Sequence, residues 1–80
     1  MEEVFIKKYW EEDGVLFYIH FKDGVAVRQI EISSTGTKYL SVAKPVDEES
    51  MLYDQGLDEL SIDDKDFITQ KDFELMWKQG

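Results

Sequence analysis

Residues 15–32 read VLFYIHFKDGVAVRQIEI, and this stretch decides the fold because it holds two strands and the turn between them. Both flanks, 15–22 and 25–32, are rich in β-branched and aromatic residues, which favour strands. Between them, Asp23-Gly24 is typical of a type I′ turn, in which both central residues need positive φ. The stretch therefore predicts a β-hairpin.

The turn also gives an expected register. A two-residue turn pairs Lys22 with Val25, and an unbroken ladder then places Arg28 opposite Ile19. Residues that lie opposite each other share a face of the sheet. The predicted core face consists of Val15, Phe17, Ile19, Phe21, Ala26, Ile30 and Ile32. The predicted outer face consists of Leu16, Tyr18, His20, Lys22, Val25, Val27, Gln29 and Glu31.

Two further strands are predicted around the hairpin. Residues 4–10 precede the hairpin across the acidic turn 11–14. A four-residue loop and a two-residue Asp13-Gly14 turn both place the same residues of 4–10 on the core face, so the predicted parity does not depend on the turn length. Val4, Ile6 and Trp10 are then expected on the core face. Residues 37–43 (TKYLSVA) form a plausible fourth strand whose buried face the pattern leaves open, and Pro45 ends it.

The end of the chain, 69–79, reads as a helix with a well-marked start. Thr69 is a good N-cap, and Ile68 and Phe73 have the spacing of a hydrophobic staple. Phe73, Met76 and Trp77 recur at helical spacing and form an apolar stripe. We expect this stripe to cover the core face. The predicted fold is α+β, an antiparallel meander of three to four strands packed on a C-terminal helix.

Residues 44–66 connect the sheet (1–43) to the helix within one 80-residue domain. Of the net charge of −9, residues 47–66 carry −8, since nine acidic residues there face Lys65 alone. Apolar residues are scattered among the acids, which predicts one or two short helical turns. An acidic surface of this kind disfavours direct binding to nucleic acid or anionic membranes.

Other features narrow the class of protein without assigning a role. The chain has no cysteine, so disulfides and thiolate metal sites are excluded. Its first residues show no signal peptide, and no apolar run reaches the length of a membrane span. The expectation is a soluble cytoplasmic protein. No phosphate loop, zinc-ligand spacing or catalytic triad stands out, so we expect no enzyme activity, cofactor or metal.

Two interpretations of the function of the acidic segment are open. It is either a docking surface for a basic protein partner, because a focused negative field selects such partners, or a solvated loop that maintains solubility. The docking reading assigns the contact to Asp58, Glu59, Asp63, Asp64 and Asp66, with Tyr53 as an aromatic anchor. A calcium loop is disfavoured because neither EF-hand frame, from Asp58 or from Asp64, has the required glycine at its sixth position.

Two single residues also stand out. Arg28 is expected on the core face, where a buried guanidinium needs an acidic partner from 47–66 or from the last helix. A structural salt bridge is the favoured reading, and an exposed anion-binding arginine is the alternative. His20, the only histidine, is expected to be an ordinary surface or half-buried residue. A small hydrolase, the most distant alternative, would need a nucleophile or a second acid–base group oriented beside it.

A second functional class rests on the predicted outer face. Its apolar residues exceed what a solvated sheet needs, which indicates a partner surface or a homodimer interface unless another segment covers them. These residues are Tyr9, Leu16, Tyr18, Val25 and Val27. The alternative function is therefore a structural or self-associating domain that uses this face.

Together, VRQIEI, the glycine-containing turn after it and the terminal ITQKDFELMW resemble a family of short uncharacterised bacterial proteins. That family has a V-R-x-[IV]-E-I strand before a C-terminal I-[ST]-x-x-[ED]-F-E-x-x-W helix, and is similar in context to immunity proteins of toxin systems. The resemblance highlights Arg28, Glu31, Phe73, Glu74 and Trp77. It implies a non-enzymatic immunity protein or inhibitor, whose partner would be a toxin or another nucleic-acid-binding protein.

Overall fold

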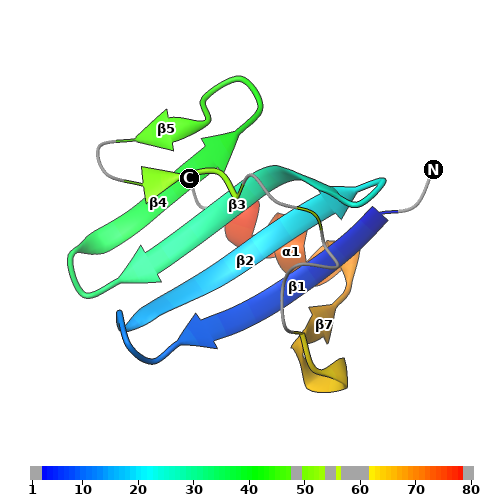
Figure 1. Ribbon diagram of the computed structural model, residues 1–80, viewed down its shortest axis with the longest axis horizontal. Helices are drawn as coiled ribbons and strands as arrows, with labels where there is room; N and C mark the ends of the chain where they lie inside the picture. Colours follow the sequence, from blue (N-terminus) through cyan, green and yellow to red (C-terminus); the bar gives the residue numbers. More distant parts are fainter. Residues whose placement is uncertain (1–2, 48–49, 54–55, 57–61, 79–80) are drawn as a thin grey trace.

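The computed structural model describes residues 3–47, 50–53, 56 and 62–78. Five strands make up its main sheet: β1 (Glu3–Trp10), β2 (Val15–Lys22), β3 (Val25–Ser33), β4 (Gly36–Ser41) and β7 (Phe67–Ile68). They are antiparallel and lie in the order β4-β3-β2-β1-β7 (Figure 1). The first four form the predicted meander, with the fourth strand present. The short β7 was not predicted.

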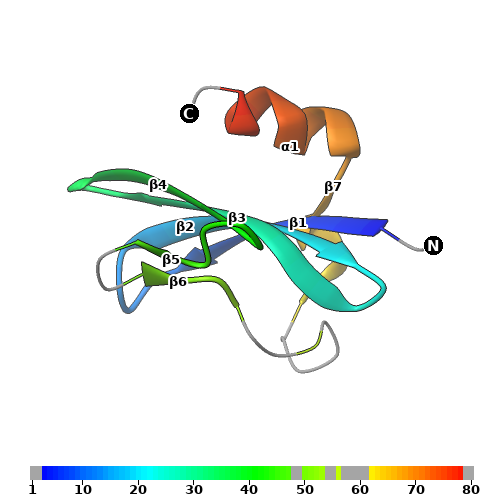
Figure 2. The same ribbon diagram turned by 90° about the horizontal axis from the view of Figure 1, so that it is seen from above.

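Both faces of the sheet are covered. Helix α1 (Gln70–Trp77) lies over one face, and the small pair β5 (Val46–Asp47) and β6 (Ser50–Met51) lies on the other (Figure 2). Beneath α1, the buried cluster consists of Phe5, Tyr18, Ile30 and Phe73. On the opposite face, the buried cluster consists of Ile6, Ile19, Phe21 and Ala26. The α+β class is confirmed, but α1 covers the face that was predicted to be outer.

The register changes in the middle of the hairpin. Asp23 and Gly24 both have positive φ (54° and 83°), and Lys22 pairs with Val25 as predicted. A β-bulge then intervenes, so that His20 pairs with Arg28. The prediction that Arg28 lies opposite Ile19 is wrong, because one extra residue in a strand inverts every later side chain.

The bulge makes β3 contribute to both cores. Before it, Ala26 packs with Ile6 and Ile19; after it, Ile30 packs beneath α1. The predicted parity of β1 is confirmed, since Ile6 pairs with Ile19. In β4, Leu40 is fully buried.

The helix begins where the sequence predicted. The Thr69 hydroxyl accepts a hydrogen bond from the backbone N–H of Asp72 at 3.1 Å. Ile68 packs against the cluster that contains Phe73, as the staple requires. Of the one or two helical turns expected in 47–66, the described residues contain one 3₁₀ turn, η2 (Asp64–Asp66). Within the described ranges, no helix is both long and apolar enough to cross a bilayer.

Candidate binding surface

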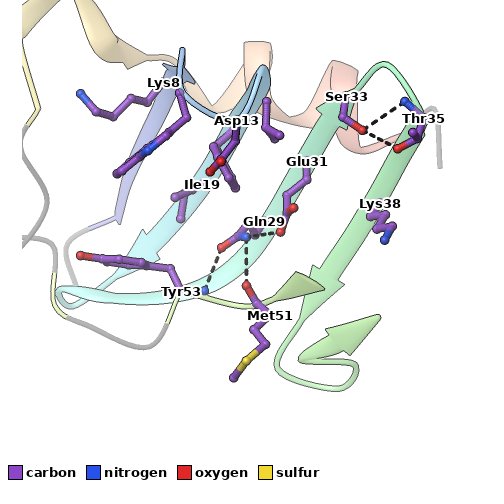
Figure 3. Close-up of a pocket in the computed structure, with 13 residues that line it drawn as sticks. Lys8, Asp13, Ile19, Gln29, Glu31, Ser33, Thr35, Lys38, Met51 and Tyr53 are labelled. Carbon is purple, nitrogen blue, oxygen red and sulfur yellow. Dashed lines mark hydrogen bonds between the residues drawn. The ribbon is translucent and has the colours of Figure 1, made fainter. Parts of the chain in front are cut away.

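A hollow of about 510 Å³ lies on the sheet face opposite α1 (Figure 3). Its floor is apolar and comes from β1 and β2: Trp10, Val15, Phe17 and Ile19. Trp10 and Phe17 meet edge to face, with ring centroids 6.1 Å apart. Trp10 remains 40% exposed. The floor follows from strand alternation, which sends every second residue of β1 and β2 to this face.

One wall of the hollow is lined by Met51 and Tyr53, and residues 51–53 are here called the wall segment. Met51 is exposed, whereas Tyr53 is half-buried with its ring edge-on to Phe21 at 6.0 Å. The wall segment is held to the sheet by Gln29, whose side chain is hydrogen-bonded to the backbone of both Met51 and Tyr53 (Figure 3). Tyr53, predicted as a partner anchor, thus lies at the hollow.

The rim of the hollow is polar and carries both signs of charge. Lys8, Asp13, Glu31 and Lys38 all line it. Lys8 also lies 3.7 Å from Asp66, which ties η2 to β1. The hollow therefore combines an apolar aromatic floor with charged edges, the usual composition of a site that holds one anchoring side chain.

The predicted acidic contact residues differ in their surroundings. Asp63 and Asp64 are exposed at η2. Asp66 has a side chain only 13% exposed; besides its ion pair with Lys8, it accepts a hydrogen bond from the backbone N–H of Asp63 at 3.0 Å. Its carboxylate therefore stabilises the turn. Asp58 and Glu59 lie outside the described residues.

Arg28 lies beneath α1, where it pairs with Glu74. Its two terminal nitrogens donate to the two carboxylate oxygens of Glu74 at 3.0 and 2.8 Å. The guanidinium carbon also lies 4.9 Å from the Phe73 ring centroid and 5.2 Å from that of Trp77. The last helix, rather than residues 47–66, thus supplies the acidic partner.

His20 is the third member of this network. Its Nδ1 accepts a hydrogen bond from Nε of Arg28 at 3.0 Å, and its Nε2 lies 2.8 Å from Oε1 of Glu3. The ring stacks on Phe5 at 4.3 Å. His20 is only 6% exposed, so the prediction of a surface or half-buried residue is wrong, because α1 covers this face.

Two pKa values respond to this arrangement. Burial lowers the pKa of His20 below its ordinary value, and the nearby Arg28 charge lowers it further, against the opposing hydrogen bond to Glu3. The hydrogen bonds from Arg28 lower the pKa of Glu74. The two pKa shifts therefore favour a neutral His20 and an ionised Glu74. These are the protonation states that their hydrogen bonds with Arg28 require.

Helix α1 also covers the middle of the face proposed for self-association. Tyr18 is buried beneath the helix and Leu16 packs against the same cluster. Tyr9 and Val25 remain exposed. The apolar residues of that face are therefore separated rather than contiguous.

The sequence missed Gln29 and Trp10 as parts of one site. Gln29 was assigned to the outer face because the bulge leaves no signature in the sequence. Trp10 was assigned correctly to the face of Ile19 but was taken as core. In the described part of the chain, no three histidine, aspartate or glutamate side chains gather as metal ligands.

Comparisons of the chain with models of protein families, with curated proteins and with solved structures found no match.

Proposed function

We propose that this protein is a non-enzymatic binding module that holds a basic segment of a partner protein on the sheet face opposite α1. The observation that carries the proposal is the position of the hollow. It lies on the sheet face against which Leu52, Tyr53 and Ile62, three described apolar residues of the segment 47–66, pack. The described acids of η2 are linked to the hollow through Lys8, which lines the hollow and pairs with Asp66.

The two parts would contribute differently. A large apolar side chain of the partner would fill the hollow against Trp10 and supply most of the affinity, as buried anchors do in protein interfaces. The carboxylates of Asp63 and Asp64 would attract flanking lysine and arginine residues and accelerate association. Asp58 and Glu59 belong to the same charged segment, whereas Asp66 would act by holding η2 in place.

An immunity protein or inhibitor is the form of this function that we favour. Such a protein would block the basic cleft of a toxin or other nucleic-acid-binding protein by placing carboxylates where phosphates otherwise bind. The strongly acidic segment supports this form of the proposal.

The proposal is tested by selecting random peptides on the immobilised protein. Enriched peptides are expected to carry a large apolar residue flanked by lysine or arginine. Titration of one enriched peptide should show at least tenfold weaker binding to Trp10→Ala, because the variant removes the aromatic floor. The Asp63→Asn/Asp64→Asn double variant should bind more weakly at about 0.1 M salt and converge on the wild type at about 1 M.

Tyr9→Ala is the matched control. Tyr9 is an exposed aromatic residue of the same strand, adjacent to Trp10, but it points to the opposite face. Its replacement should change affinity by less than about twofold. Enrichment of peptides without basic residues, or equal binding by Trp10→Ala and wild type, would refute the proposal.

A further inference from the structure

Gln29 is an unusual residue to find inside a small sheet. It is only 2% exposed, and the β3 bulge turns it onto the face of the hollow. Its Nε2 donates to the backbone oxygen of Met51 at 3.1 Å and to Oε2 of Glu31 at 2.9 Å. Its Oε1 accepts from the backbone N–H of Tyr53 at 2.8 Å. Both N–H donors and the oxygen of this amide are therefore used.

These contacts imitate a neighbouring strand. In an extended segment, the C=O of one residue and the N–H of the residue two places later lie on the same edge. In a parallel pair, one residue of the neighbouring strand bonds both groups with its own N–H and C=O, and Gln29 bonds both with its side-chain amide. The opposite edge of the wall segment is paired by ordinary backbone contact, since the Leu52 N–H donates to the Pro45 oxygen at 2.7 Å.

The position of this wall therefore depends strongly on one side chain. A buried amide that loses a partner carries a desolvation cost, so the loss of any one of these three hydrogen bonds should be costly. The same wall segment supplies Met51 and Tyr53 to the hollow (Figure 3). Any displacement of its backbone would change the width of the hollow.

We infer that Gln29 is the positioning residue of the hollow, fixing the wall segment at the distance from the floor that suits one anchoring side chain. The role of the hollow as a partner site rests on the proposed function. The role of Gln29 in holding the wall does not, and the two are tested by separate measurements.

The first measurement is hydrogen exchange of the Tyr53 amide in Gln29→Leu, a variant of similar size without hydrogen-bonding groups. Protection of Tyr53 should fall at least tenfold, whereas the central Ile19 amide should retain its protection. Affinity for a selected basic peptide should fall at least fivefold. Glu31→Gln serves as the control, because it keeps an oxygen that accepts from Gln29 and should leave Tyr53 protection within twofold.

Gln29→Glu is a second variant, and it should make the protection of the Tyr53 amide depend on pH, which a change in packing alone would not do. At neutral pH its carboxylate would face Met51 oxygen and Glu31, so the wall should be released. On protonation it regains an O–H donor, and Tyr53 protection, corrected for intrinsic exchange, should rise as pH falls. The wild type should show no such rise.

The outcomes separate the two ideas. Unchanged Tyr53 protection in both variants would overturn the inference, and so would unchanged peptide affinity after protection is lost. If the wild type selects no peptide, the proposed function fails, whereas Tyr53 exchange still decides whether Gln29 holds the wall.

Discussion

At the scale of single residues, the network under α1 depends on a neutral imidazole. The Nε of Arg28 can only donate, so Nδ1 of His20 must accept and its proton must reside on Nε2, facing Glu3. Protonation of Nδ1 would remove this acceptor and place two positive groups together. Arg28 also pairs with Glu74 of α1, so the protonation state of His20 also affects the ion pair that attaches the helix to the sheet.

Stability should therefore fall as pH decreases from about 7.5 to about 5. The folded pKa of His20 is lowered from 6.5, so the unfolded chain binds more protons within this window. The stabilising contribution is complete above the unfolded pKa and is lost as pH falls from there toward the lowered folded value. Urea unfolding at closely spaced pH values measures this slope.

His20→Gln supplies the control, because it is the only histidine in the chain. The slope between pH 7.5 and 5 should disappear in this variant. Loss of stability below about pH 4.5 should persist, since the pKa of Glu74 is lowered from 4.5 and its contribution is lost as that carboxylate is protonated. An unchanged slope in His20→Gln would contradict the assignment.

At the scale of elements, α1 is too short to be stable alone. It has eight residues, and isolated helices of that length are marginal in water. Its stability comes from packing Phe73 on the sheet, from the Arg28–Glu74 ion pair and from the Thr69 cap. The cap is the contribution most easily removed without disturbing the core.

Thr69→Ala should lower the free energy of unfolding by about 1 kcal/mol, because the Asp72 N–H loses its acceptor. Thr69→Ser keeps the hydroxyl and should stay within a few tenths of a kcal/mol of the wild type. Chemical denaturation of the three proteins measures the difference. Equal losses in both variants would indicate that the hydroxyl does not act as a cap.

At the scale of the whole molecule, the net charge is concentrated in one segment of the sequence. The net charge is −9 and lies mostly within 47–66, and the described residues Leu52, Tyr53 and Ile62 of that segment pack on the face opposite α1. Like charges held close together disfavour the compact state through self-repulsion. The same concentration of charge that would attract a basic partner should therefore lower the stability of the free protein.

Added salt should raise the urea midpoint between about 0.01 M and about 0.1 M, as the screening length falls from about 30 Å to about 10 Å. Two adjacent exposed residues of η2, Asp64 and Lys65, carry opposite charges, so their neutralisation should shift the urea midpoint in opposite directions. At low salt, Asp64→Asn should raise the midpoint and Lys65→Gln should lower it. Shifts of the same sign in both variants would rule out self-repulsion as the cause.

The sequence by itself determined the local features of this protein. The Asp23-Gly24 turn, the meander of the first three strands, the parity of β1 and the Thr69 cap all follow from contacts between residues near in sequence. It also indicated that Arg28 needs a carboxylate. Such features are readable because their energetics depend on a few neighbouring residues.

Only the tertiary structure decided the features that join distant segments. The β3 bulge reversed the faces of Gln29 and Ile30, and this in turn decided which side α1 covers and where a hollow forms. Because β2 is apolar on both faces, its pattern fits a helix on either side. The choice depends on the combined packing of β3, α1 and the wall segment, which no local pattern encodes.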